Sequence, residues 1–323
     1  MYFIRIALLA FIVFGPIAGF SQTLKAWEKA IDKAWASGDY YAAMTWLSKA
    51  LERAPDRVDF QYKYAEVCRR FHAYEVAETW YKKVMDGPSS DQYEEAKFGL
   101  GLVQKNLGKY EAARDNFRRY AENPNNPSER ILLAEKEAEN CLWASNLPPP
   151  DPTKTAIIHL DRKINSPWSE FGALPRQDSL FYSSYRYDKA EDKNRPPRKI
   201  SKIMLARPGA RGRPLPRRFN DPKKFTAYTA FSTSGDRMYF AICDYVGPDI
   251  QCALYYREKD RRGRWKKTPV ALPASVNLPG FTTTHPAIGF DSTRQKEVLF
   301  FASNRPGGAG GMDIWQTEID ENT

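Results

Sequence analysis

Few residues of the 323-residue chain are suited to acid–base, nucleophilic or metal chemistry. The three histidines, His72, His159 and His285, have no second histidine or cysteine at metal-ligand spacing. The sequence contains no Gly-x-Ser-x-Gly elbow and no His-Glu-x-x-His pair. Acidic pairs such as Glu94-Glu95 are interpreted as solvated charges. We therefore expect no catalytic residue, no metal and no cofactor in this chain.

A glycine-rich segment, Gly307–Gly311, could be interpreted as a phosphate-binding loop. That interpretation is weak because no Gly-Lys-Ser/Thr follows, and because the next residues have the pattern of a strand whereas a phosphate loop opens a helix. The glycines instead predict a tight hairpin turn, in which Asp313 can accept a hydrogen bond from the turn backbone.

The N-terminal residues indicate the compartment. Arg5 is followed by an apolar run, a Gly15-Pro16 break and small residues before Gln22, which is the layout of a cleaved signal peptide over residues 1–21. The run is short for a membrane span. In an oxidising compartment, Cys243 and Cys252 are expected to form a disulfide, because they bracket a turn-rich segment between two β-like runs. Cys68 and Cys141 are expected to be free buried thiols.

The formal net charge is +10, and the excess of basic side chains lies in the second half of the chain. Much of it falls between Arg186 and Lys224. Such a stretch could bind nucleic acid, anionic lipid or an acidic protein, and a solvated, proline-rich loop is the favoured alternative. No nucleic-acid partner is expected.

A helical repeat of about 34 residues runs from residue 22 to residue 147. Ala43, Ala77 and Ala113 recur at this spacing, each followed one turn later by a bulky residue. The pattern resembles the tetratricopeptide repeat (TPR) family, with three helical hairpins and a capping helix at 128–147. In this last helix, Ser128 is expected to cap the N-terminus, and Ile131, Leu132, Ala138 and Leu142 are expected to form the apolar face because they lie at helical spacing.

The resemblance to TPR proteins implies a concave groove that binds a peptide or a protein segment. The alternative is that the helices only pad the neighbouring domain. The candidate residues for contact with a partner in this groove are Trp27, Tyr64, His72, Lys97 and Gln104.

A proline-rich linker at 148–155 predicts a domain boundary, after which short β-like runs begin. Three runs repeat about every sixty residues: 180–184, 238–242 and 299–303. Each is combined with neighbouring short strands, which is typical of propeller blades. A strand at 155–160, containing His159, is expected to close the last blade.

The segment from Phe300 to Trp315 resembles the signature of a WD-repeat-like propeller found in periplasmic and cell-envelope proteins. Residues 156–323 are therefore expected to form a partial, all-β propeller of about three blades. The structural residues of this signature are Ser303, Asn304, Arg305, Gly307, Gly308, Gly311, Asp313 and Trp315.

The order of signal peptide, TPR array and propeller resembles envelope proteins of the Bacteroidota, including the peptidoglycan-associated component of type IX secretion and gliding machinery. The resemblance implies a non-enzymatic periplasmic scaffold, peripheral to the outer membrane, whose partners are other envelope or secretion-complex proteins. It also implies peptidoglycan binding through a C-terminal domain of the outer-membrane-protein-A type, which is absent from this chain. The chain is expected to be a fragment of a longer protein, and the alternative is that a partner completes the ring of blades.

The alternative function is binding of cell-wall glycan or a small ligand in the propeller channel. Its candidate residues are Trp168, Trp265, Arg186 and Arg305. Structural aromatics at blade interfaces are the favoured interpretation of these tryptophans.

Overall fold

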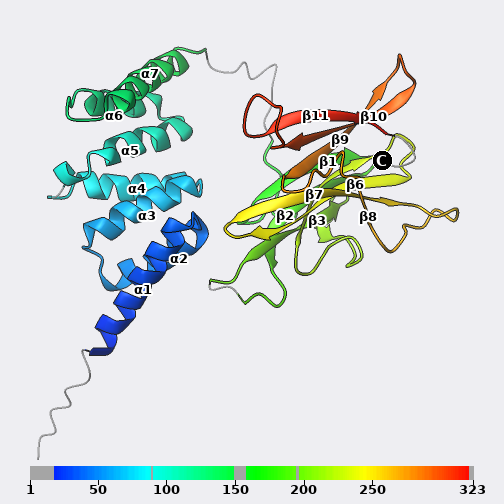
Figure 1. Ribbon diagram of the computed structural model, residues 1–323, viewed down its shortest axis with the longest axis horizontal. Helices are drawn as coiled ribbons and strands as arrows, with labels where there is room; N and C mark the ends of the chain where they lie inside the picture. Colours follow the sequence, from blue (N-terminus) through cyan, green and yellow to red (C-terminus); the bar gives the residue numbers. More distant parts are fainter. Residues whose placement is uncertain (1–17, 89, 149–157, 194–195, 320–323) are drawn as a thin grey trace, which may run out of the picture. The chain divides into compact units, whose positions relative to one another are not determined.

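The computed structural model describes residues 18–88, 90–148, 158–193 and 196–319. The chain divides into two compact units, residues 1–149 and 150–323 (Figure 1). The predicted signal peptide, apart from its last residues, and the predicted linker, apart from residue 148, lie outside the described residues, so both stay predictions. No helix among the described residues is long and apolar enough to cross a membrane.

The described part of the first unit is helical. Its seven α-helices are α1 (Ala18–Ala36), α2 (Tyr40–Arg53), α3 (Val58–Arg70), α4 (Tyr74–Met85), α5 (Glu95–Asn106), α6 (Tyr110–Ala121) and α7 (Ser128–Ser145). A short 3-10 helix, η1 (Ser90–Gln92), precedes α5. Each α-helix packs against the next one in the chain, so the unit is a stack of hairpins, α1/α2, α3/α4 and α5/α6, followed by α7 (Figure 1).

The small residues that recur in the sequence lie where the helices pack most closely. Ala43, Ala77 and Ala113 in α2, α4 and α6 are completely buried. The side chains of Leu47, Tyr81 and Phe117, one turn later in the same helices, are buried as well. A small residue lets two helix axes approach, and the bulky one fills the space beside it. These helices therefore fit a TPR-like array.

The capping helix α7 differs from its prediction in two details. Its first turn has Pro127 at the N-cap, and Ser128 makes no side-chain capping bond. Its buried face consists of Ala134, Ala138 and Cys141, whereas Leu132 and Leu142, which were expected to share the core face, are 66% and 44% exposed. Small residues pack here because α7 lies close against α6.

The described part of the second unit is all β. Its strands are β1 (Glu170–Arg176), β2 (Ser179–Asp188), β3 (Lys199–Ala206), β4 (Arg213–Pro214), β5 (Phe225–Phe231), β6 (Arg237–Val246), β7 (Asp249–Glu258), β8 (Val270–Ala271), β9 (Thr283–Asp291), β10 (Lys296–Ser303) and β11 (Asp313–Glu318). They form three antiparallel sheets, in the orders β1-β2-β3-β4, β5-β6-β7-β8 and β9-β10-β11.

The three sheets pack on one another through their first strands. β5 packs against β1, β2 and β3 of the first sheet, and β9 packs against β5, β6 and β7. Aromatic and aliphatic side chains fill these junctions, as in the stacked pair Tyr185 and Phe225, whose ring centroids are 5.9 Å apart. The strands predicted at 180–184, 238–242 and 299–303 lie in β2, β6 and β10. Each of these is the second strand of its sheet and is hydrogen-bonded to a strand on both sides.

The strand predicted at 155–160 is not found in the part of it that the structure describes. Residues 158–160 have no strand hydrogen bonds and His159 lies in irregular chain. A short apolar run forms a strand only where a neighbouring edge is available. Residues 155–157 lie outside the described residues.

Candidate functional site

One face of the helical unit is formed by α1, α3, α5 and α7, and we call it the odd-helix face. Ion pairs join neighbouring helices along it. Asp32 of α1 accepts from Lys63 of α3 at 2.9 Å, and Glu95 of α5 accepts from Arg130 of α7 at 2.9 Å. Two further pairs, Glu28 with Arg57 at 3.0 Å and Lys105 with Glu137 at 2.6 Å, lie at the same two junctions. Exposed ion pairs contribute little to stability, so the main effect of these residues is to place charged side chains of both signs along the face.

The junction between α3 and α5 is different because it is aromatic. The ring of Tyr62 lies 5.1 Å from the ring of Tyr93, measured between centroids. Burial and the carboxylates of Glu66 and Glu95 raise the pKa of Tyr62 to about 12, so its hydroxyl stays protonated at neutral pH. The centre of the odd-helix face therefore carries a neutral aromatic ring between charged pairs.

Beneath this aromatic centre lies a buried carboxylate. Glu66 of α3 is 8% exposed, accepts from the Tyr81 hydroxyl and pairs with Arg69 at 2.8 Å. Burial alone would raise the pKa of Glu66, but Arg69 and Tyr81 together hold it below its usual range. Burial and the same carboxylate raise the pKa of Tyr81. The hydrogen bond from Tyr81 therefore joins α4 to α3 beneath the odd-helix face.

Most of the residues predicted to contact a partner lie in the packing of the array and do not converge. Trp27 and Tyr64 are partly buried among the apolar residues of the first two hairpins. Gln104 is 4% exposed and accepts a hydrogen bond from Asn116 at 2.7 Å, so it contributes to packing. His72 is exposed in the turn between α3 and α4, and Lys97 pairs with Glu94, the N-cap residue of its own helix. Partner binding by these five residues stays a prediction.

The sequence signature around β10 and β11 is a set of structural contacts. Asp313 accepts a hydrogen bond from the backbone N–H of Gly310, the kind of bond that the sequence predicts. Trp315 donates its indole N–H to the Ser303 carbonyl at 3.3 Å, and Asn304 accepts from the backbone N–H of Thr282 at 2.7 Å. Gly307, Gly308 and Gly311 lie in the turn that joins the two strands. These residues close the end of the third sheet.

At the same end of each sheet, corresponding positions of the second strand make a stabilising contact, either a hydrogen bond or a disulfide. Ser184 and Ser303 lie in β2 and β10 opposite the first residue of β1 and of β9, and each accepts from the arginine two residues later, Arg186 or Arg305. In the second sheet this position is held by Cys243, which forms a disulfide with Cys252 directly opposite it in β7. The predicted disulfide is therefore confirmed.

The predicted ligand-binding residues of the β unit also have structural contacts. Arg186 binds Glu170 at 2.8 Å, and Arg305 donates to the backbone carbonyls of Ser275 and Val276. Trp265 packs edge to face against Phe219. Trp168 alone among the four is largely exposed, with the Lys199 ammonium 4.8 Å from its ring centroid. Binding of glycan by these residues stays a prediction.

Two residues of the packed first strands have a backbone that sequence analysis does not predict. Tyr228 in β5 and His285 in β9 both have positive φ, 54° and 52°, at the bulges of their strands. Their ring centroids are 3.7 Å apart, and burial lowers the pKa of His285. Positive φ is uncommon for a tyrosine, and neither position has a local sequence signal. No group of three metal-ligating side chains occurs among the described residues.

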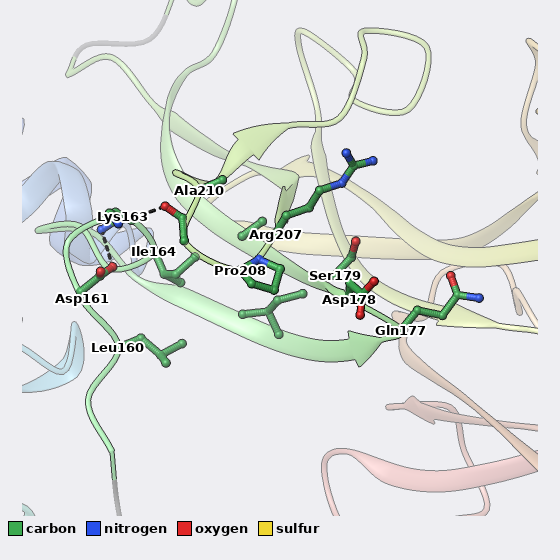
Figure 2. A pocket seen from close by; sticks show the side chains of 13 residues that line it. Leu160, Asp161, Lys163, Ile164, Gln177, Asp178, Ser179, Arg207, Pro208 and Ala210 are labelled. Carbon is green, nitrogen blue, oxygen red and sulfur yellow. Dashed lines mark hydrogen bonds between the residues drawn. The ribbon is translucent and has the colours of Figure 1, made fainter.

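The second unit also has surface cavities. One, of about 380 Å³, lies between the loop after β3 and the segment before β1 (Figure 2). Its lining includes Leu160, Ile164 and Pro208 together with the polar residues Asp161 and Asp178. In Figure 2, the backbone N–H of Lys163 donates to the Asp161 carboxylate, and its ammonium group donates to the Gly209 carbonyl in the loop after β3.

No protein-family model matches the chain, and no curated protein matches it. Part of the chain is similar to solved TPR domains. One is the first TPR of Spaghetti (RPAP3) bound to the HSP90 peptide SRMEEVD, at 21% identity and TM-score 0.34, covering 38% of this chain and 95% of that one. Others are the Arabidopsis OM64 TPR domain (18% identity, TM-score 0.33, 38% and 98% covered) and the second TPR domain of human RPAP3 in complex with the HSP70 peptide SGPTIEEVD (16%, 0.32, 38% and 98%).

Proposed function

We propose that this chain is a protein-interaction scaffold whose odd-helix face binds an extended segment of a partner protein. The observation that carries the proposal is the arrangement of that face: charged pairs at the α1/α3 and α5/α7 junctions lie on either side of the aromatic centre at Tyr62. Charged and aromatic side chains presented together on rigid helices are suited to recognition of a peptide by both hydrogen bonding and apolar contact. Two of the solved TPR domains that are similar to part of this chain were determined with a chaperone peptide bound.

The proposal extends to the second unit and to the cell envelope. The three sheets, packed through their first strands, are interpreted as blades of a WD-repeat-like propeller. The predicted signal peptide and the confirmed disulfide support an exported, periplasmic protein. On this view the scaffold is associated with the outer membrane or cell wall, and its partners belong to an envelope assembly such as type IX secretion.

Site-specific photo-crosslinking of the full chain tests the binding face. A photoreactive amino acid replaces Asp32, whose side chain on the odd-helix face is 66% exposed, and a matched control replaces Val76, an exposed residue of α4. In cells, we expect a discrete protein adduct from position 32 and none from position 76. Equal adducts from both positions, or none from position 32, would contradict the proposal.

The alternative, glycan binding through the second unit, needs a separate measurement. The exposed ring of Trp168 favours testing it, because sugars stack on exposed aromatic faces. Full chain and a Trp168→Ala variant are incubated with purified peptidoglycan and sedimented. Retention of the wild type that is lost in the variant would support glycan binding, whereas equal retention of both, or no retention, would exclude a role for Trp168.

A further inference from the structure

Three arginines at the connection between β3 and β4 border one cavity; Arg207 and Arg211 lie in the loop and Arg213 begins β4. Arg207, Arg211 and Arg213 line a space of about 320 Å³ together with the apolar side chains of Leu205 and Leu215. Leu205 and Arg213 are directly paired across β3 and β4. Directly paired residues share a face of a hairpin, and so do residues two apart in extended chain, so Leu205, Arg213 and Leu215 lie on the same side of it. The cavity therefore has a cationic rim and an apolar wall.

The loop that carries the arginines is held in one conformation. Lys163 donates from its ammonium group to the Gly209 carbonyl and accepts from the Gly212 N–H, both at 3.0 Å. A Cβ at Gly212 would lie 1.8 Å from the Tyr182 hydroxyl, so the backbone there is in close contact with the sheet. In Figure 2, Arg207 extends away from Asp161 and Lys163. The guanidinium groups are thus presented from a fixed backbone.

The charge of these arginines is not balanced within the described residues. Arg207, Arg211 and Arg213 are exposed and have no carboxylate within ion-pair distance there, whereas Arg264 and Arg294 on other loops of the same unit are paired with Asp260 and Glu318. Like charges held close together repel, and an anion between them relieves that repulsion. Guanidinium groups match phosphate oxygens in geometry and bind them with two parallel hydrogen bonds.

We propose that this cavity binds a phosphate monoester that carries a short carbon chain. The phosphate contacts Arg207, Arg211 and Arg213, and the carbon chain lies against Leu205 and Leu215. The ester could be a soluble metabolite or the headgroup of an anionic lipid, since both present the same phosphate. This site lies on the β unit and does not depend on partner binding by the odd-helix face.

Binding is measured with the full chain and two probes. Glycerol phosphate in solution is titrated by calorimetry, and phosphatidylcholine vesicles with and without phosphatidic acid are used for co-sedimentation. We expect binding of at least one probe, weakened about a hundredfold or more in the triple variant Arg207→Gln, Arg211→Gln, Arg213→Gln, because several charge-assisted bonds are lost together. Tighter binding to phosphatidic acid vesicles identifies a lipid headgroup, and binding of glycerol phosphate alone identifies a soluble ester.

A second triple variant separates a built site from general attraction. Arg261→Gln, Arg262→Gln, Lys267→Gln removes the same charge from another loop of the unit. We expect its affinity for the probes to stay within about threefold of the wild-type affinity, because salt screens charges that lie far from the cavity. The proposal is overturned if neither probe binds the wild type, or if both triple variants weaken binding equally. If the first variant does not fold, the single variant Arg211→Gln takes its place, with an expected loss of about tenfold.

Discussion

The hydroxyl of Tyr81 in α4 donates a hydrogen bond to the buried carboxylate of Glu66 in α3. Arg69 binds the same carboxylate at 2.8 Å, so one acidic group satisfies a phenol and a guanidinium in the interior of the second hairpin. Removing the negative charge of this acceptor takes away the ionic partner of Arg69 and weakens the hydrogen bond from Tyr81, because hydrogen bonds to an ionised group are the stronger ones. The stability of the helical unit should therefore depend on the ionisation of this one group.

We predict that Glu66→Gln lowers the free energy of unfolding of the helical unit by about 1–3 kcal/mol at neutral pH. The pKa of Glu66 is lower in the folded chain than its ordinary value, so its ionised form stabilises the fold above the unfolded pKa of about 4.3. This contribution is lost as the pH falls through the folded pKa. The difference between wild type and variant, measured by urea unfolding followed by circular dichroism, should shrink below about pH 4.

Glu75→Gln is the matched control for this prediction, because Glu75 is an exposed carboxylate of the same hairpin. It should change the free energy of unfolding by less than about 0.5 kcal/mol at either pH. A Glu66→Gln deficit that is the same in acid and at neutral pH would show that the cluster does not act through the charge of Glu66.

We predict that replacing Cys243 and Cys252 together by serine lowers the stability of the β unit by about 2–3 kcal/mol. The disulfide joins β6 to β7 across a loop with a sequence separation of 9, so reduction frees a short segment of the unfolded chain. Chemical unfolding of the β unit, followed by tryptophan fluorescence with and without reductant, measures the change. The double variant and the reduced wild type should agree, and no change on reduction would contradict the prediction.

The free cysteines provide the internal control for the reduction experiment. Cys68 and Cys141 are both buried thiols, and burial raises the pKa of Cys68 to about 12. They should stay unmodified by a thiol reagent until the helical unit unfolds, because the thiolate is the reactive form. Reduction should then leave the helical circular dichroism signal unchanged.

We predict that Arg305→Met lowers the stability of the β unit by about 1–3 kcal/mol. Arg305 donates to the carbonyls of Ser275 and Val276, in the segment that precedes β9, and methionine supplies no donor in its place. Arg294→Met is the control, since Arg294 is an exposed partner of Glu318 and such pairs contribute less than about 1 kcal/mol. Equal losses in the two variants, measured by thermal unfolding, would contradict a specific role for Arg305.

The positions of the repeated elements could be predicted from the sequence because each repeat needs the same kind of residue at the same packing position. Ala43, Ala77 and Ala113 are small wherever two helices approach, and the apolar runs at 180–184, 238–242 and 299–303 each lie in the second strand of their sheet, with a neighbouring strand on both sides. The capping helix α7 was harder to predict. It is covered on one side only, so the apolar residues Leu132 and Leu142 could be assigned to the core although they are exposed.

The residues of a binding face are less visible in one sequence than the residues of a core. Gln104 looked available for a partner, yet it is bonded to Asn116 inside the array. The bulged contact between Tyr228 and His285 depends on two strands far apart in the sequence, and no local pattern predicts positive φ at an aromatic residue. The charge of the arginine loop was visible in the sequence, but the cavity that it borders is formed only when β3 and β4 pair.

The turns inside the three hairpins give the last prediction. Gly38, His72 and Gly108 lie at the same place in successive hairpins and have φ of 71°, 62° and 73°. In each turn the next residue donates its N–H to a carbonyl five residues back, as Ala73 does to Cys68. The backbone is therefore the same in all three, and only His72 has a side chain in the left-handed region, where a Cβ is unfavourable.

We expect His72→Gly to raise the free energy of unfolding of the helical unit by roughly 0.5–1 kcal/mol. The gain should exceed the loss of the exposed contact between the rings of His72 and Tyr74, whose centroids are 5.6 Å apart. His72→Ala removes the same ring but keeps a Cβ, so it should give no gain. Urea unfolding of the two variants distinguishes them: if alanine stabilises as much as glycine, the imidazole ring, and not the backbone conformation, is the source of the strain.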